Sequence, residues 1–284
     1  MNKKHYGVIG HPIGHTLSPF IHTKLMKLSG INGDYSVFDI APEDLSTQFS
    51  TTLAQLDGFN ATIPHKQAVM KLADELDETA ALYGSVNTIA FVKNGGSVTS
   101  KGCTTDGIGF VNAIADAGIM LNGTVTIIGC GGVGRVFANT CAKAGCTLNL
   151  LECESAVENT RIFADSINER FGSGTARVFV TEDFSGDSDL LINATPIGMY
   201  PNCDACAVGD NVISRSKAVF DAVYNPSETL IVKKARAAGI PALTGMTMLV
   251  YQAAAAQTFW NGSRYNAEDI AQIAKECFEE LAKR

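Results

Sequence analysis

Residues 124–152 read TVTIIGCGGVGRVFANTCAKAGCTLNLLE, and this stretch decides the class of fold. A β-branched run leads directly into the glycine-rich turn GCGGVGR (129–135). A helix-forming segment and a second apolar run, which ends at Glu152, follow the turn. Strand, turn, helix and strand form one βαβ unit of about 30 residues. A G-x-G-x-x-G motif in this context predicts a Rossmann-type dinucleotide site.

The glycines of this turn have separate expected roles. Gly129 and Gly131 would allow a tight turn and a close approach of the pyrophosphate, and Gly134 would let the helix pack near the strand. The amino end of the helix then offers unpaired N–H groups to the anion. A glycine-rich turn that binds nothing is the alternative. The predicted cofactor-contacting residues of the turn are Gly129, Cys130, Gly131, Gly132, Val133 and Gly134.

Glu152 bears on which dinucleotide is bound. It lies 23 positions after Gly129 (152 minus 129), at the end of the second predicted strand. An acidic residue there hydrogen-bonds the ribose hydroxyl of NAD. No lysine or arginine occurs between Lys143 and Arg161, so a 2′-phosphate would meet only negative charge. The residues favour NAD over NADP, with Arg135 as the nearest cation that could reverse this. A solvated strand end is the alternative reading of Glu152.

Strands and helices alternate along the 284 residues, which predicts an α/β fold with parallel sheets in two domains. We expect continuous helices over 42–56 and 65–84, and a hairpin whose turn is NGG (94–96). Another helix is expected from Ser18, with Ser18 as N-cap and Pro19 in the first helical position.

Composition excludes several classes of protein. The net charge is −7, and no block of lysine or arginine suggests a nucleic-acid binder. The longest apolar stretch, 246–260, is too short to span a membrane, and we expect a cytoplasmic protein with a small-molecule substrate. A homodimer is compatible with the sequence.

The cysteines and histidines do not form a recognisable metal motif. Cys203 and Cys206 form a lone CxxC, and His11 and His15 flank a proline and a glycine, so we expect no metal site. A further set of cysteines around the glycine turn is expected to pack as buried thiols: Cys130, Cys141, Cys146 and Cys153.

A lysine and an aspartate are the candidate proton-transfer pair. Lys66 follows a predicted strand and a proline, at a helix start, and Asp106 lies at the predicted domain junction. A lysine beside a carboxylate can exchange protons when the pair is partly buried. Lys66 as an ordinary surface cation is the alternative.

Over nearly its full length the chain resembles the shikimate dehydrogenases. The motifs that carry the resemblance are GHPIGHTLSP (10–19), NATIPHK (60–66), GSVNT (84–88), TTDGIG (104–109), GCGGVGR (129–135), NATPIGM (193–199), DAVYNPSET (221–229) and GMTMLVYQA (245–253). The resemblance implies a substrate domain (1–105 plus 246–284) and a Rossmann domain (106–245), with the C-terminal helices returning to the first domain.

The resemblance also implies roles for individual residues. Lys66 would be the catalytic base, paired with Asp106. The implied substrate contacts are Thr16 and Ser18 for the carboxylate, and Thr62, Asn87, Tyr224 and Gln252 for the ring hydroxyls or carboxylate. The further implied cofactor contacts are Thr195, Ala222, Gly245 and Met246.

Three departures from the family pattern stand out. Thr16 replaces the usual serine, and its methyl group narrows the carboxylate pocket. Glu152 lies where NADP-using members carry an Asn-Arg-Thr type motif, although NADP is the family default. Thr247 replaces a usual glycine. The resemblance implies reversible interconversion of 3-dehydroshikimate and shikimate. An NAD-dependent quinate or quinate/shikimate dehydrogenase and a non-catalytic dinucleotide sensor are the alternatives.

Overall fold

The computed structural model describes residues 3–14 and 16–283, and the chain divides into two compact units. Unit 1 comprises residues 1–109 and 250–280, and unit 2 comprises residues 110–249 and 281–284. The predicted α/β fold is confirmed, with C-terminal helical chain belonging to the first unit. The boundaries between the units fall within three helices, α5 (Asp106–Asp116), α10 (Met246–Asn261) and α11 (Ala267–Leu281).

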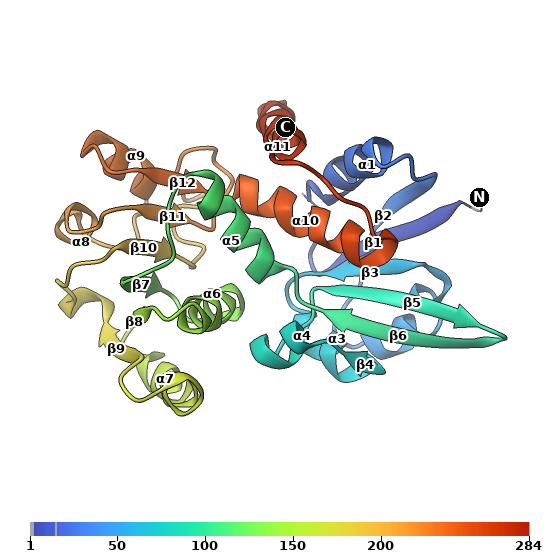
Figure 1. Cartoon of the computed structure of the whole chain (residues 1–284), viewed down its shortest axis with the longest axis horizontal. Coiled ribbons are helices and arrows are strands. Elements are labelled where there is room, and N and C mark those ends of the chain that lie inside the picture. The colour runs from blue at the N-terminus through green and yellow to red at the C-terminus, as the bar shows by residue number, and fades with distance from the viewer. Residues whose placement is uncertain (1–2, 15, 284) are drawn as a thin grey trace. The chain divides into compact units, whose positions relative to one another are not determined.

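Unit 1 contains a six-stranded sheet of mixed direction, in the order β2-β1-β3-β5-β6-β4 (Figure 1). Its parallel pairs are β2–β1, β1–β3 and β4–β6, and β5, the first strand of the expected hairpin, pairs antiparallel with both β3 and β6. The strands are β1 (Lys4–Gly10), β2 (Gly33–Asp39), β3 (Gly58–Ala61), β4 (Glu75–Leu76), β5 (Thr88–Asn94) and β6 (Ser97–Cys103). The helices are α1 (Ser18–Leu28), α2 (Leu45–Ser50), α3 (Lys66–Leu72), α4 (Glu78–Tyr83) and α11 (Ala267–Leu281), with a 3₁₀ turn η1 (Leu53–Gln55).

Unit 2 contains a fully parallel sheet in the order β12-β11-β10-β7-β8-β9. From β7 the chain adds β8 and β9 toward one edge of the sheet. It then returns to the other side of β7 and adds β10, β11 and β12 toward the opposite edge. Right-handed crossovers therefore place α6 and α7 on one face and α8 and α9 on the other (Figure 1). The strands are β7 (Thr124–Ile128), β8 (Thr147–Glu152), β9 (Ala176–Val180), β10 (Leu190–Asn193), β11 (Val219–Asp221) and β12 (Ala242–Thr244). The helices are α6 (Gly132–Lys143), α7 (Val157–Phe171), α8 (Asp210–Ser214) and α9 (Leu230–Ala237), with a 3₁₀ turn η2 (Thr181–Asp183).

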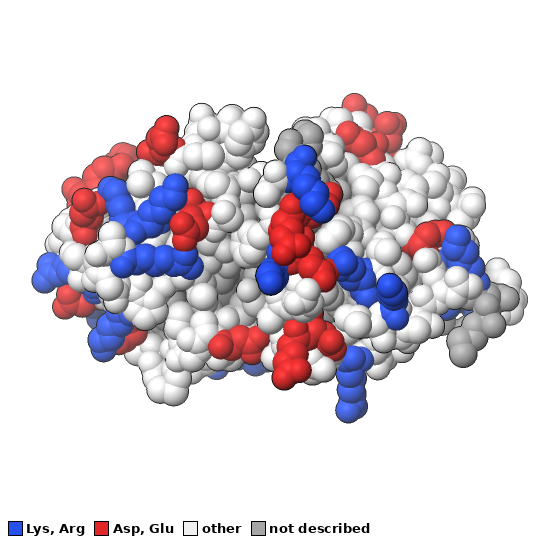
Figure 2. Space-filling view, turned by 90° about the horizontal axis from the view of Figure 1, so that it is seen from above, with Lys and Arg blue, Asp and Glu red and all other residues white. Residues whose placement is uncertain are grey.

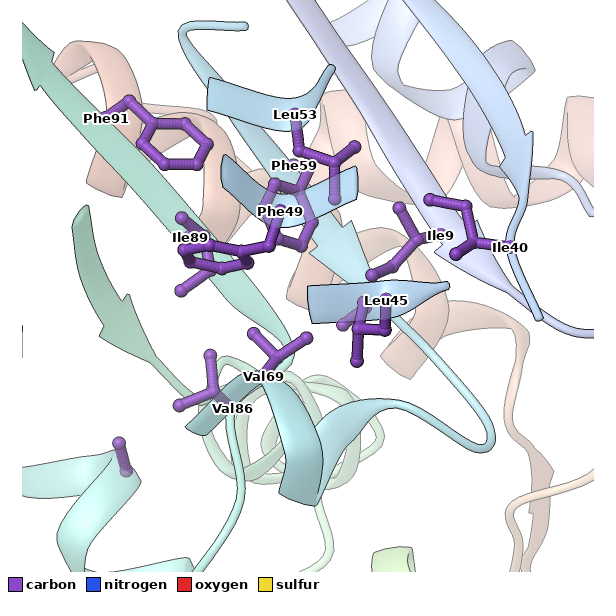
Figure 3. Packing of buried hydrophobic residues seen from close by; sticks show 12 residues of the cluster. Ile9, Ile40, Leu45, Phe49, Leu53, Phe59, Val69, Val86, Ile89 and Phe91 are labelled. Atoms are coloured by element: carbon purple, nitrogen blue, oxygen red, sulfur yellow. The ribbon is translucent and has the colours of Figure 1, made fainter. Parts of the chain in front are cut away.

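Each unit has its own apolar core. In unit 1, Phe49, Phe59 and Phe91 pack edge to face or tilted, with ring centroids 5.7–6.0 Å apart, against Ile89 and neighbouring aliphatic side chains (Figure 3). Such aromatic geometry adds to the stabilisation from burial alone. Separate clusters mean that each sheet is held by its own side chains.

Two predicted helices are interrupted. The segment 65–84 forms α3, the short strand β4 and α4, because Asp74 accepts hydrogen bonds from the N–H and hydroxyl of Ser100 and draws the chain onto β6. Asp77 then caps α4 by accepting from the N–H of Ala80 at 2.9 Å. The expected helix 42–56 breaks after Ser50. The hydroxyl of Thr51 donates to the Thr47 carbonyl, a local bond that competes with helix continuation.

Smaller expectations also need correction. Ser18 is the first residue of α1 rather than its N-cap, and its N–H donates to Thr16 Oγ1 at 3.1 Å. Pro19 is accordingly one position further into the helix. Cys130, Cys141 and Cys146 are buried as expected, but Cys153 is exposed.

The described part of the chain bears on metal binding and on membranes. Within residues 3–14 and 16–283, no three His, Cys, Asp or Glu side chains gather in a way that could hold a metal ion, and His15 lies outside the described residues. In the same part of the chain, no helix is both long and apolar enough to cross a membrane. On the face shown in Figure 2, acidic and basic side chains lie next to one another rather than in separate areas.

Candidate active site

The candidate proton-transfer pair lies within unit 1. Lys66 begins α3 and Asp106 begins α5, and Lys66 Nζ donates to Asp106 Oδ2 at 2.5 Å. The Lys66 side chain is 24% exposed and that of Asp106 is 8% exposed, so the pair is mostly withdrawn from water. A partly buried pair of this kind can hold a proton at a defined position while the lysine nitrogen stays accessible to a substrate.

Asn87 fixes the other oxygen of this carboxylate. Its Nδ2 donates to Asp106 Oδ1 at 2.8 Å and lies 3.3 Å from Gln252 Oε1. Its Oδ1 accepts from the N–H of Thr105 at 2.9 Å, which sets the orientation of the amide. The structure thus brings together four predicted site residues, Lys66, Asn87, Asp106 and Gln252, through hydrogen bonds within unit 1.

Two hydroxyls stand at the start of α1. Thr16 Oγ1 donates to Ser18 Oγ at 3.1 Å and accepts from the N–H of Ser18. Thr62 follows β3, and its N–H donates to the Ile9 carbonyl, which ties it to the end of β1. These positions follow the carboxyl ends of strands β1 and β3, where polar side chains of an α/β sheet gather.

The glycine turn of unit 2 has the geometry that a bound pyrophosphate requires. Gly129 has φ +85°, a conformation that favours glycine. A Cβ at Gly134 would collide with the Gly129 carbonyl oxygen, so only glycine permits this close approach of α6 to the turn. A Cβ at Gly131 or Gly132 would meet nothing within 4 Å, which leaves open space over the amino end of α6. The residues present therefore fit a dinucleotide.

Glu152 and Arg135 both bind the backbone of Cys130. Glu152 Oε2 accepts from the Cys130 N–H at 3.0 Å, and Arg135 Nε donates to the Cys130 carbonyl at 3.1 Å. The Arg135 guanidinium also stacks over the Phe163 ring, 4.5 Å from its centroid. Burial raises the pKa of the Cys130 thiol to about 12, with the nearby Glu152 charge acting in the same direction. The Cys130 thiol is thus neutral, and the charges at this edge are Glu152 and Arg135.

The remaining predicted residues of unit 2 lie at the carboxyl ends of β10 to β12. Thr195 Oγ1 donates to Asn193 Oδ1 at 2.6 Å, and its methyl group lies against Gly129. A Cβ at Gly245 would collide with the Ala222 carbonyl, so these two backbones touch. Met246 is fully buried and Tyr224 is half-buried. Tyr224 belongs to unit 2, whereas the other predicted substrate contacts belong to unit 1.

Asp221 is a buried carboxylate near the predicted residue Ala222, and the sequence did not single it out. It is fully buried at the end of β11 and accepts from Asn193 Nδ2, the Val223 N–H and the Thr229 hydroxyl. Burial raises the pKa of this carboxyl to about 6, despite three donors that act in the opposite direction. Its presence within the motif 221–229 was a signal, but its burial could not be read from spacing. Asn60, Thr88 and Thr105 also lie inside family motifs (60–66, 84–88 and 104–109), and their burial could not be read from spacing either.

A parallel sheet with this turn, together with a lysine–aspartate pair in a second α/β unit, defines the class: a dinucleotide-dependent oxidoreductase. Residues 8–89 match the profile of the shikimate dehydrogenase substrate binding domain. A shikimate dehydrogenase (NADP+) of Methanococcus maripaludis is 37% identical over 262 residues, 91% of each chain. The chain belongs to the shikimate dehydrogenase family.

Solved structures of similar proteins differ in the dinucleotide they hold. A shikimate dehydrogenase in complex with NADP+ matches with a TM-score of 0.87 and 34% identity, over 97% of this chain and 96% of the other. A shikimate 5-dehydrogenase of Listeria monocytogenes in complex with shikimate and NAD matches with a TM-score of 0.84 and 27% identity, over 95% and 96%. Both dinucleotides thus occur in structures similar to this one.

Proposed function

We propose that this chain is a shikimate dehydrogenase that interconverts 3-dehydroshikimate and shikimate. The observation that carries the proposal is the Lys66–Asp106 pair, with Asn87 on the same carboxylate, in the unit whose residues match the family's substrate-binding profile. A protein that only binds a dinucleotide has no need for a partly buried proton-transfer pair.

In this proposal Lys66 moves the proton. During oxidation of shikimate, Lys66 takes the proton of the reacting hydroxyl as the carbon loses a hydride. In the reverse direction, the Lys66 ammonium gives that proton to the carbonyl oxygen. Asp106 stabilises the ammonium form and holds the nitrogen in place. The nicotinamide, when bound, supplies or accepts the hydride.

Polar groups of unit 1 would hold the substrate. With the substrate bound, the Thr16 and Ser18 hydroxyls would donate to its carboxylate in place of the Thr16–Ser18 bond, and Thr62, Asn87 and Gln252 would bind its ring hydroxyls. Tyr224 is the contact that we assign to unit 2. Fixed polar partners of this kind give discrimination, because an analogue that lacks a hydroxyl leaves a buried group unpaired.

The dinucleotide would be held by unit 2. The glycine turn 129–134 takes the pyrophosphate at the amino end of α6, and Glu152 takes the ribose hydroxyl. Thr195, Ala222, Gly245 and Met246 would border the nicotinamide half. We propose NAD as the preferred cofactor, because the Glu152 carboxylate lies at the turn and Arg135 is engaged with Cys130 and Phe163. The similar proteins that are named for NADP+ make this the sharpest point to test.

A second candidate is an NAD-dependent quinate or quinate/shikimate dehydrogenase. Thr16, with one methyl more than serine, and Glu152 favour it. Quinate differs from shikimate by an added hydroxyl on a saturated ring carbon, so the shape of the pocket near the carboxylate decides between them.

The test is kcat/KM for shikimate and quinate, each with NAD and with NADP. Preference for shikimate with NAD supports the full proposal. Shikimate with NADP keeps the activity and contradicts the role of Glu152, which would point to Arg135. Preference for quinate selects the second candidate, and no turnover in any combination favours a dinucleotide sensor. We also propose a cytoplasmic location, and light scattering on the purified protein would tell a monomer from a homodimer.

A further inference from the structure

A buried tyrosine stands beside the hydroxyls at the start of α1. Tyr35, on β2, is 8% exposed, and its hydroxyl donates to Asn60 Oδ1 at 2.7 Å. The Ser18 hydroxyl lies near enough to this tyrosine to act against the effect of burial on its pKa. Thr16 in turn donates to Ser18 Oγ. Tyr35 therefore lies between the hydroxyls at the start of α1 and the buried Asn60.

The direction of these hydrogen bonds is fixed by Asn60. Its Nδ2 donates to the backbone carbonyl of Asn87 at 3.2 Å and to Thr88 Oγ1 at 2.9 Å. A backbone carbonyl can only accept, so Nδ2 faces Asn87 and Oδ1 faces Tyr35. The Tyr35 hydroxyl has a single hydrogen, which it gives to Asn60, so toward the nearby Ser18 hydroxyl its oxygen can act only as an acceptor.

The same sequence of bonds continues to the proton-transfer pair. Thr88 Oγ1 donates to Asn87 Oδ1 at 2.9 Å, and Asn87 Nδ2 donates to Asp106 Oδ1 at 2.8 Å. Asp106 Oδ2 receives the Lys66 hydrogen bond. An unbroken line of hydrogen bonds thus joins Tyr35 at one end to Lys66 at the other, and all of its members belong to unit 1.

We propose that Tyr35 is a positioning residue, which couples the hydroxyls of Thr16 and Ser18 to the Asn87–Asp106–Lys66 group through Asn60 and Thr88. This inference rests on the proposed dehydrogenase function. Tyr35 touches neither substrate nor dinucleotide in this proposal. Its role is to orient the groups at both ends of the substrate site.

Burial makes the line rigid. Thr88 is fully buried, and Asn60 and Asn87 are 7% and 2% exposed, so these three interior members cannot exchange their partners for bulk water. Burial also raises the pKa of Tyr35 well above its usual range, so its hydroxyl stays protonated. The Tyr35 ring is stacked on His22, 4.1 Å between centroids and 7° from parallel, which prevents it from turning away. Removing one member leaves its neighbours buried and unpaired.

The first test is Tyr35→Phe, which keeps the ring stack and removes only the hydroxyl. We expect kcat for shikimate oxidation to fall about tenfold, the effect of one lost buried hydrogen bond, and KM for shikimate to rise as well. Tyr6→Phe is the matched control. Tyr6 is also buried, at 1% exposed, stacks on Trp260 and donates to an asparagine, Asn261, at 2.8 Å, but it is not part of the line. Its kcat and KM should equal those of the unmodified chain.

The second test separates positioning from general loss of structure. If Tyr35 acts through Thr88, the effects of Tyr35→Phe and Thr88→Val on kcat are not additive, and the double variant is no slower than Thr88→Val alone. In the control double variant, Tyr6→Phe with Thr88→Val, the separate effects of the two substitutions on kcat should multiply, as independent effects do. Thr88→Ser keeps the hydroxyl and should restore kcat, which tests the line even if Tyr35→Phe does not fold.

Each result is decisive. An unchanged kcat and KM in Tyr35→Phe, multiplying effects in the double variant, or equal losses in Thr88→Ser and Thr88→Val would each overturn the inference while the dehydrogenase function stands. Absence of turnover in the unmodified chain would overturn the proposed function and this inference together.

Discussion

The Glu152 carboxylate accepts a hydrogen bond from the backbone N–H of Cys130 at 3.0 Å. Glu152 ends β8 and Cys130 belongs to the glycine turn, so a negative charge lies at the rim of the dinucleotide site. Its second oxygen accepts from the Cys153 N–H at 3.1 Å, which holds the carboxylate in this orientation. A 2′-phosphate brought to the same place would meet a like charge at short range.

Removing this charge should relax the proposed preference for NAD. Glu152→Gln keeps an acceptor for the Cys130 N–H and deletes only the charge. We expect kcat/KM with NADP to rise about tenfold and that with NAD to fall by a smaller factor, because a carboxylate bond to a hydroxyl is stronger than a neutral one. Glu154→Gln, at an exposed neighbouring position, is the control. An unchanged NAD-to-NADP ratio in Glu152→Gln would refute the assignment.

Two glycines of the turn should behave differently when replaced. Gly131 has φ −70° and open space around its missing Cβ, so Gly131→Ala should fold normally but place a methyl group where the pyrophosphate binds. We expect at least a tenfold rise in the Kd for NAD with an unchanged Tm. Gly134→Ala forces a methyl group into the Gly129 carbonyl and should lower Tm by several degrees, as overpacking does. Calorimetry and fluorescence titration of both variants measure these effects. A large loss of Tm in Gly131→Ala would contradict the open space at that position.

The features predicted correctly from sequence are those set by local chemistry. The glycine turn between β7 and α6, the start of α3 at Lys66, and the two-residue turn at Gly95 and Gly96, both with positive φ, all follow from residues adjacent in the chain. The family motifs added Asn87 and Gln252, which the structure does place beside Asp106 and Thr105.

The features that were missed depend on contacts far apart in the sequence. The break between α3 and α4 depends on Asp74 meeting Ser100, 26 positions away. The Tyr35–Asn60 bond joins residues 25 positions apart on strands separated by β1. No periodicity or local motif marks Tyr35. In the sequence it is one more aromatic residue in a predicted strand, and its partner is found only when the pairing of the strands is known.

Loss of the Lys66 amine should sharply lower the rate of the reaction without changing the affinity for the dinucleotide. For Lys66→Ala we expect kcat to fall at least 100-fold, the usual contribution of a positioned acid or base, because the proton of the reacting hydroxyl then has no acceptor. The Kd for NAD should stay the same, since the glycine turn belongs to unit 2. Lys71→Ala, an exposed lysine on the same helix α3, is the matched control and should retain kcat. A Lys66→Ala enzyme that keeps more than a tenth of kcat would remove Lys66 from the mechanism.

His22 should make unit 1 sensitive to moderate acid. It is 1% exposed, stacked on Tyr35 and bonded through Nδ1 to Gln257 Nε2 at 3.0 Å, and burial lowers its pKa to about 3. The unfolded chain binds a proton on this histidine below about pH 6.5, whereas the folded chain does not until about pH 3, so stability falls as the pH drops through this window.

His22→Phe keeps a flat ring against Tyr35 and removes the titrating group. Between pH 7.5 and 5 the unmodified chain should lose roughly 2 kcal/mol more free energy of unfolding than the variant. Urea unfolding at both pH values measures this difference. The variant is expected to be less stable at pH 7.5, because the Gln257 Nε2 loses its acceptor on His22, so the two stability curves should converge as the pH falls. Stopping at pH 5 limits the contribution of the carboxylates whose pKa values are lowered by ion pairs, such as Asp34 and Asp57, because these act at lower pH. Parallel curves for the two proteins would mean that His22 accepts a proton in the folded state, and that the Tyr35 ring stack tolerates a charge.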